Sequence, residues 1–118
     1  MNDYLIGIMY HEPESWDLWN KGVIEDYESS TGIFITASSI ADAIKWAEII
    51  GEKLLRFVNS DNSLSYSKLN YECWHEPDIK ESGWDHCLSH FQHVKVGEMP
   101  NLKNMTTESY EKWQSENT

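Results

Sequence analysis

The chain of 118 residues carries 20 acidic and nine basic side chains, for a formal net charge of −11, together with six tryptophans and six tyrosines. Acidic chains that stay disordered are poor in aromatic residues, so this composition excludes a merely solvating polymer and predicts a folded core with a strongly negative surface. At 13.8 kDa the chain fits one domain, 1–118. Such a domain buries about two thirds of its unfolded surface and needs no disulfide or metal to fold.

The start of the chain and the cysteine content predict the compartment. Met1-Asn2-Asp3-Tyr4 lacks the basic segment of a signal peptide, and the apolar run Leu5–Tyr10 is too short to span a membrane. We therefore expect a cytoplasmic protein without membrane contact. In a reducing compartment Cys73 and Cys87 are expected to be buried thiols. One bridge between them remains the alternative for an exported chain.

The first third of the chain predicts two strands of one antiparallel sheet. Asp3–Tyr10 is a β-rich apolar run typical of a central strand, and Gly32–Ala37 has the same character. Between them, Pro13 and Asn20-Lys21-Gly22 indicate turns. Val23–Tyr27 is predicted to be a short edge strand, whose acids would discourage pairing with another chain.

A long amphipathic helix is predicted over Ile40–Asn59. Ser39 caps it, with Asp42 three residues later in a pattern like a capping box. Gly51 lies on the apolar side, where it costs up to about 1 kcal/mol relative to alanine, so a strand or second helix is expected to approach it closely. The apolar side is formed by Ile40, Ala43, Ile44, Ala47, Ile50, Leu54, Leu55 and Val58. This helix is expected to pack on the sheet.

The second half predicts shorter elements. Lys68–His75 alternates like a strand, Glu76–Gly83 reads as a loop, and His90–Val96 is a further predicted strand. Thr106 and Thr107 cap a predicted terminal helix, Glu108–Ser115. The expected fold is α+β: a mostly antiparallel sheet packed against one long amphipathic helix, with a short C-terminal helix.

The acids gather in two stretches that also contain tryptophan. In His11–Glu28, six acids face one base, Lys21, and in Glu72–Asp85 five acids face Lys80. Carboxylates steer a basic partner and pair with its cations, while indoles supply apolar anchors. The candidate partner-binding residues are Glu12, Glu14, Trp16, Asp17, Trp19, Glu25, Asp26, Glu28, Glu72, Trp74, Glu76 and Asp78. The competing interpretation is that acidity simply keeps the domain soluble.

Among the tryptophans, Trp16 and Trp19 are the preferred contact pair. They are three residues apart, so both can project from one face of a helical turn among carboxylates. Core packing remains the alternative for this pair. Trp46 is expected in the core or at its boundary, and Trp113 is expected to hold the terminal helix in place.

Other chemistries find little support in the sequence. His86, His90 and His93, and the pairs Cys73/His75 and His86/Cys87, match no zinc spacing, so we expect no metal and no cofactor. No nucleophile elbow and no glycine-rich phosphate loop are present. The scattered bases form no patch for direct nucleic-acid binding. Catalysis is therefore not expected.

The acid–aromatic stretch His11–Glu28 and the strand–cap–helix unit GIFITASSIADAIKWAEII give the chain its resemblance to a known class. It resembles the small acidic immunity proteins of bacterial toxin systems, especially those of contact-dependent growth inhibition. The resemblance implies a cytoplasmic protein without catalysis that binds a basic toxin domain, for example a nuclease, and blocks its active site. No diagnostic motif transfers a role to a single residue.

Two further function classes stay open. A decoy that mimics nucleic acid, of the anti-restriction or anti-CRISPR type, should arrange its carboxylates in rows like phosphates and expose few aromatic residues. A small enzyme would need a pocket with convergent polar groups. The clustering of acids with tryptophan favours a protein interface over the decoy.

Overall fold

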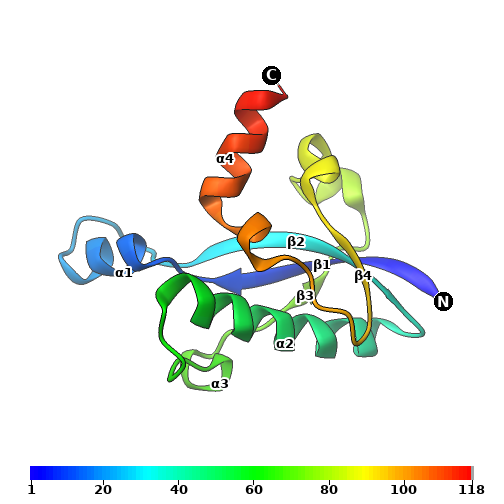
Figure 1. The fold of residues 1–118 in the computed structure, drawn as a ribbon, viewed down its shortest axis with the longest axis horizontal. Coiled ribbons are helices and arrows are strands. Elements are labelled where there is room, and N and C mark those ends of the chain that lie inside the picture. The colour runs from blue at the N-terminus through cyan, green and yellow to red at the C-terminus, as the bar shows by residue number, and fades with distance from the viewer. Residues whose placement is uncertain (118) are drawn as a thin grey trace.

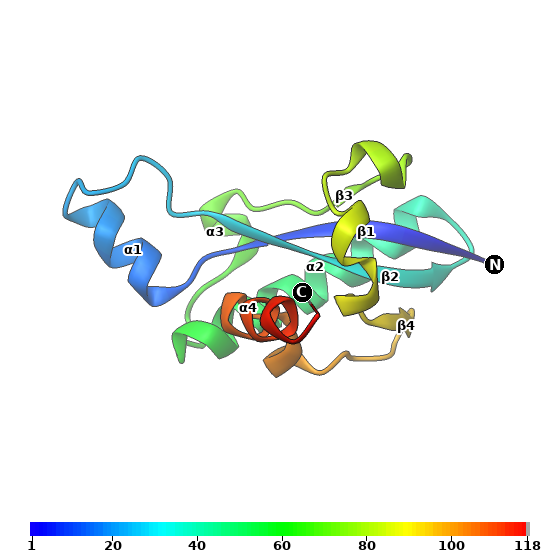
Figure 2. The same ribbon diagram turned by 90° about the horizontal axis from the view of Figure 1, so that it is seen from above.

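The computed structural model describes residues 1–117 and has an α+β fold (Figures 1 and 2). A four-stranded sheet has the order β3-β1-β2-β4. Its strands are β1 (Asn2–Tyr10), β2 (Ser29–Ala37), β3 (Trp74–His75) and β4 (His93–Lys95). The helices are α1 (Pro13–Asn20), α2 (Ile40–Asn59), α3 (Tyr66–Leu69) and α4 (Thr107–Glu116), with 3₁₀ segments η1 (Ile79–Glu81), η2 (Asp85–His90) and η3 (Leu102–Met105). The predicted class, the long helix and the short C-terminal helix are confirmed.

Strands β1 and β2 form the centre of the sheet as expected, and α2 packs on one of its faces. They pair antiparallel along their whole length, from Asn2↔Ala37 to Tyr10↔Ser29. Alternate residues of both strands face α2 and are fully buried, because successive side chains of a strand point to opposite faces. The core on this face contains Ile6, Ile8, Tyr10, Ile33, Ile35, Ala43, Ala47, Ile50, Leu54 and Leu55.

Helix α2 begins and ends as its sequence indicates. The Ser39 hydroxyl accepts a hydrogen bond from the Asp42 main-chain N–H at 3.1 Å, and the chain leaves the helix through Ser60 in the left-handed conformation. The predicted apolar stripe is wrong at its first member, since Ile40 is exposed. Ile40 lies in the first helical turn, beyond the part of the helix that covers the sheet.

Glycines make room for aromatic rings on both faces of the sheet. A Cβ on Gly51 would lie 1.9 Å from the Tyr66 hydroxyl, so the expected close approach to α2 is confirmed, by α3 and by β1. On the other face, the cross-strand pair Gly7 and Gly32 lies under Trp74 and Phe91, whose rings would be 2.2 Å and 2.5 Å from added Cβ atoms. A second, smaller core of Leu5, Cys87 and Phe91 forms on this face.

Three predicted strands are wrong in whole or in part. Val23–Tyr27 has no strand and belongs to the connection after α1. Of Lys68–His75, only β3 is extended, because α3 and the left-handed Asn70 interrupt the pattern. Of His90–Val96, only His93–Lys95 (β4) pairs as a strand, since His90 still belongs to η2.

The sheet is mixed because β4 runs parallel to β2. The expectation of a mostly antiparallel sheet holds for β1–β2 and β1–β3. Strand β4 follows η2 in the chain and pairs with the outer edge of β2 in the same direction as β2. The local sequence pattern predicts a strand here but does not predict its direction, because the direction depends on the path of the chain between β2 and β4.

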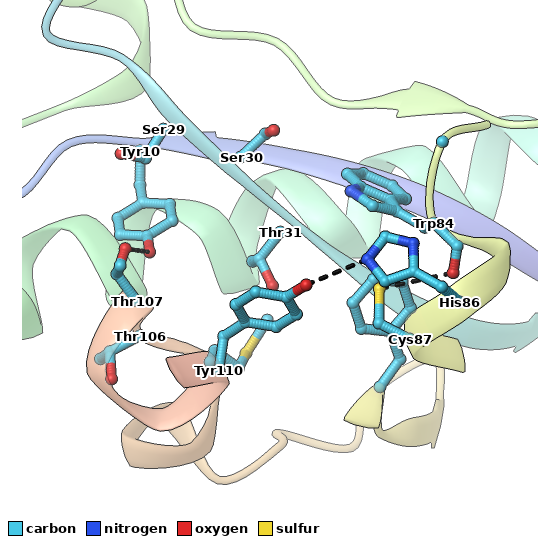
Figure 3. A pocket seen from close by; sticks show the side chains of 13 residues that line it. Tyr10, Ser29, Ser30, Thr31, Trp84, His86, Cys87, Thr106, Thr107 and Tyr110 are labelled. Carbon is cyan, nitrogen blue, oxygen red and sulfur yellow. Dashed lines mark hydrogen bonds between the residues drawn. The ribbon is translucent and has the colours of Figure 1, made fainter. Parts of the chain in front are cut away.

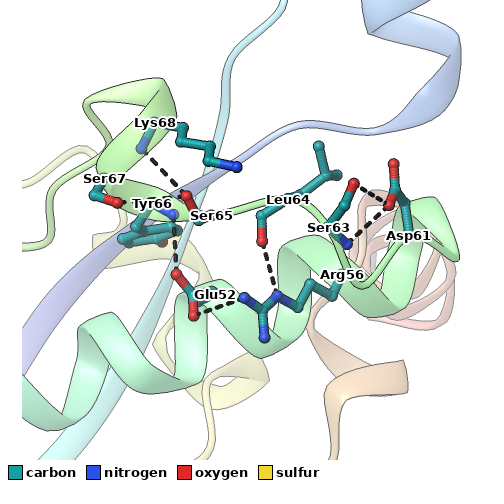
Figure 4. Close-up of polar contacts among 9 residues, drawn as sticks. All are labelled: Glu52, Arg56, Asp61, Ser63, Leu64, Ser65, Tyr66, Ser67 and Lys68. Carbon is teal, nitrogen blue, oxygen red and sulfur yellow. Dashed lines mark hydrogen bonds and ion pairs between the residues drawn. The ribbon is translucent and has the colours of Figure 1, made fainter.

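Polar contacts tie α3 to the C-terminal half of α2 (Figure 4). The Glu52 carboxylate pairs with Arg56 at 3.2 Å and accepts the Tyr66 main-chain N–H at 3.0 Å. The Arg56 Nε donates to the Leu64 carbonyl at 2.7 Å. Within residues 1–117, Glu52–Arg56 is the only ion pair. The carboxylates of the two acidic stretches therefore have no cationic partner in the described part of the chain.

Candidate protein-binding surface

The first acidic stretch forms a projection at one end of the sheet. Pairing of β1 with β2 ends at Tyr10↔Ser29, so residues 11–28 extend beyond the sheet, as both ribbon views show (Figures 1 and 2). The turn that Pro13 predicted is instead the start of helix α1, because proline at the first helical position has a suitable φ and needs no N–H partner there. Helix α1 has no buried residue.

An aromatic cluster holds the projection against the body. Trp16 stacks on the buried ring of His11 with a centroid distance of 4.9 Å, and Tyr27 packs edge-on against Trp16 at 4.8 Å. Trp19 contacts both Trp16, at 5.3 Å, and Tyr27, at 4.8 Å. Trp16 is half-buried, whereas 38% of Trp19 is exposed. The two predicted contact tryptophans thus share one cluster, with Trp16 as its inner member and Trp19 as its outer member.

Exposed apolar residues surround Trp19. Leu18 is 40% exposed and Val23 is 65% exposed, and the Val23 N–H donates to the Leu18 carbonyl at 2.9 Å, which holds the two residues together. Neither residue is among the candidates that the sequence pattern indicates, because Val23 is predicted to lie in a strand and Leu18 stands outside the acid–indole pattern. The available signal concerned Leu18 alone, which has no apolar residue three or four positions away on either side. We call Leu18, Trp19 and Val23 the α1 apolar patch.

The acids of this stretch lie on the same projection as the α1 apolar patch and are exposed, with one exception. Glu14, Asp17, Glu25, Asp26 and Glu28 are exposed. Glu12 differs, because its Oε1 accepts hydrogen bonds from the Tyr10 hydroxyl, at 3.1 Å, and from the Thr107 main-chain N–H, at 3.0 Å. Glu12 thus stabilises the N-terminus of α4 instead of facing solvent freely.

The second predicted cluster divides in the structure. Glu72 is exposed and follows Tyr71, whose hydroxyl lies 2.8 Å from His11 Nδ1 at the base of the projection. Trp74 packs over Gly7, and its indole N–H donates to the Glu76 carboxylate at 2.7 Å. Asp78 accepts the Lys80 main-chain N–H at 3.0 Å and caps η1.

These contacts decide which acids lie near the projection. Glu72 lies beside it through Tyr71, whereas Trp74 packs over Gly7 on the second face of the sheet, with Glu76 bonded to it, and Asp78 caps η1. The structure therefore brings Glu72 together with the first stretch and leaves the rest of the second stretch apart.

His11 is a titratable residue that is buried where the projection joins the rest of the domain. Its ring is enclosed by Trp16, Tyr27 and Tyr71, and Asn59 Nδ2 donates to the His11 carbonyl at 2.8 Å. Burial lowers the pKa of His11 below its usual value, because a charged imidazolium would lose its hydration there. Burial also raises the pKa of Tyr71, helped by the nearby Tyr27 and Glu28.

We expect the protein to lose stability as the pH falls below about 6.5, the usual pKa of histidine. Above that value His11 is neutral in both the folded and the unfolded state. Below it, the unfolded chain binds the proton more readily than the folded protein, so protonation favours unfolding. The loss of stability ends once the pH falls below the lower pKa of the folded state. Urea unfolding at pH 7.5 and at lower pH should show this slope, and His11→Phe should flatten it. His90, whose pKa burial also lowers, supplies a remaining part of the slope. An unchanged slope in His11→Phe would contradict the prediction.

Residues 1–117 contain no group of three or more histidine, cysteine, aspartate or glutamate side chains placed to hold a metal ion. Both cysteines are free and buried, as predicted, and they belong to different cores. None of the described helices combines the length and the apolar character needed to cross a membrane. Comparisons with protein-family models, with curated proteins and with solved structures find no match for this chain.

Proposed function

We propose that this protein is a binding module for a basic protein and that the α1 projection is its contact surface. The observation that carries the proposal is the α1 apolar patch, which is exposed on a projection that also carries carboxylates without an ion pair in residues 1–117. A monomeric protein gains no folding energy from exposing Leu18, Trp19 and Val23 together. A partner that covers them gains apolar burial and an indole anchor.

The electrostatics of the projection favour a cationic partner. Five acids are exposed on the projection and form no ion pair within residues 1–117, namely Glu14, Asp17, Glu25, Asp26 and Glu28, and Lys21 is the single base in residues 11–28. Such a surface attracts lysine and arginine over a distance set by salt screening. These charges are expected to raise the association rate more than they slow dissociation.

The biological role that we propose is that of an immunity protein in the cytoplasm, which neutralises a basic toxin domain by covering its active site. This part rests on the resemblance stated above and on the acidic contact surface. A mimic of nucleic acid is less favoured, because the exposed carboxylates share the projection with the exposed apolar side chains Leu18, Trp19 and Val23, which a surface that imitates phosphates does not need. A cysteine enzyme is also less favoured, since burial raises the pKa of Cys73 to about 12 and also raises that of Cys87, which opposes thiolate formation.

The experiment that tests the proposal is capture of the partner from the source organism by the tagged protein, followed by titration of the captured protein's activity. The expected result is a cationic protein whose activity is suppressed near one-to-one stoichiometry. Turnover of a small substrate by the protein itself, or capture only of acidic proteins, would contradict the proposal.

A charge variant separates the projection from general acidity. Replacing Asp17, Glu25 and Glu28 with their amides should slow association with the captured partner about tenfold or more at low salt, because steering depends on local charge. The matched control replaces Glu108, Glu111 and Glu116 of α4, three exposed acids on another element, with glutamine. Stopped-flow measurements over a series of salt concentrations provide the rates. Equal slowing in both variants would show that net charge alone acts.

A further inference from the structure

A pocket that the proposed function does not use lies beside the first residues of β2, between η2 and α4 (Figure 3). Its volume is about 450 Å³, within the range of sites for small ligands. The lining comes from the end of β1, the start of β2, the loop into η2 with η2 itself, Phe91, and the end of η3 with the first turn of α4. A ligand of moderate size can therefore enter without displacing either core.

The edge of β2 is open where it borders this pocket. Strand β4 pairs with Phe34–Thr36 only, and the Phe34 N–H donates across that edge to the Gln92 carbonyl at 3.0 Å. Main-chain groups of alternate residues point to the same side of a strand, so Ser30 directs its N–H and C=O to the edge that Phe34 uses. No strand of the described chain covers Ser30 there. One residue thus presents a donor and an acceptor side by side.

The walls of the pocket combine aromatic rings with serine and threonine side chains. Trp84 and Phe91 pack edge-to-face at 5.3 Å on one side, and the Tyr110 hydroxyl lies 3.0 Å from His86 Nε2 across the opening. The Thr31 side chain points into the cavity (Figure 3), and its hydroxyl has no hydrogen-bond partner among residues 1–117. No lysine, arginine, aspartate or glutamate lines the pocket, although the chain holds 29 such residues in 20 acids and nine bases.

We propose that this pocket binds an uncharged planar heterocycle with a hydrogen-bond donor and acceptor on one edge, as in a nucleobase without phosphate. The Ser30 main-chain pair takes that edge, Trp84 contacts the ring and Thr31 binds a second polar atom. The pocket lining contains no lysine or arginine that could compensate an anionic ligand for its lost hydration. It also contains no carboxylate that could compensate a cationic ligand. A neutral aromatic ring matches the open main-chain edge at Ser30, the aromatic side chains and the absence of acidic and basic side chains from the lining.

The probes are 2-aminopyrimidine and adenine as neutral rings, with adenosine monophosphate as the charged control. Amide NMR titrations of the full chain to about 10 mM cover the weak affinities expected of such small ligands. We expect saturable shifts for the Ser30 and Thr31 amides and the Trp84 indole with both neutral rings. Binding of the monophosphate should be at least about tenfold weaker. No saturable shift at these positions, or equal binding of the monophosphate, would overturn the proposal.

Two variants and a matched control test the contacts. Ser30→Pro removes the outward N–H at a position where β1 pairing needs no donor, and should weaken 2-aminopyrimidine binding about fivefold or more. Ser30→Ala keeps the N–H and should bind like wild type, because the Ser30 hydroxyl points away from the cavity (Figure 3). Thr31→Val keeps the shape and loses the hydroxyl, and should weaken adenine binding several-fold.

Circular dichroism establishes that each variant is folded before titration. If Ser30→Pro unfolds, the ligand affinity of Thr31→Val is compared with that of Ser30→Ala, and this comparison decides the outcome. Wild-type affinity in every folded variant that lacks a proposed contact would overturn the site, whereas selective loss in those variants would support it.

Discussion

Replacing Leu54 with alanine is expected to lower the free energy of unfolding by about 2–5 kcal/mol. Leu54 is fully buried in the core between α2 and the sheet, together with Ile8, Ile33 and Ile50. The substitution removes apolar burial and leaves a cavity that the close-packed surroundings fill only in part. Urea unfolding followed by far-ultraviolet circular dichroism measures the change.

Ile49→Ala in the same helix is the matched control, because the Ile49 side chain is 47% exposed. We expect it to cost under about 1 kcal/mol, since little apolar surface returns to water and alanine is a better helix former. Similar losses at both positions would contradict the orientation of α2. So would a loss at Leu54 below about 0.5 kcal/mol.

The second large effect is expected at the α1 surface, where Trp19→Ala should weaken binding of the captured partner by about 2 kcal/mol or more, about 30-fold. Trp19 is the outer member of the aromatic cluster and the centre of the α1 apolar patch. Truncation removes the indole anchor and leaves the half-buried Trp16 to maintain the contact with His11. Isothermal titration calorimetry with the captured partner provides the affinity.

Phe57→Ala serves as the control for this prediction, because Phe57 is a comparably exposed aromatic residue on α2. It should leave partner affinity unchanged. Unfolding curves of both variants distinguish lost contacts from lost structure. Full affinity in a folded Trp19→Ala protein would reject the α1 projection as the contact surface.

The candidate site could be predicted from the sequence only in part. The concentration of acids and indoles in residues 11–28 was visible directly, and the structure brings Trp16, Trp19 and the exposed acids of that stretch into one projection. Leu18 and Val23 could not be selected, because exposure is a property of what the rest of the chain covers. Trp74 follows the same acid–indole pattern as Trp19, yet it packs over Gly7.

By itself, the sequence determined β1, α2, α4 and the Gly32–Ala37 part of β2, since alternation, helical periodicity and the caps at Ser39 and Thr106 act between residues close in the chain. The first three residues of β2, Ser29–Thr31, became part of the strand only through pairing with β1. Only the tertiary structure decided the direction of β4, the shortness of β3 and the free edge at Ser30. These features depend on how distant segments share the two faces of the sheet. The Gly7–Gly32 pair leaves room for the rings of Trp74 and Phe91 on the second face of the sheet. This packing forms only once β1 and β2 have paired, so no local sequence pattern predicts it.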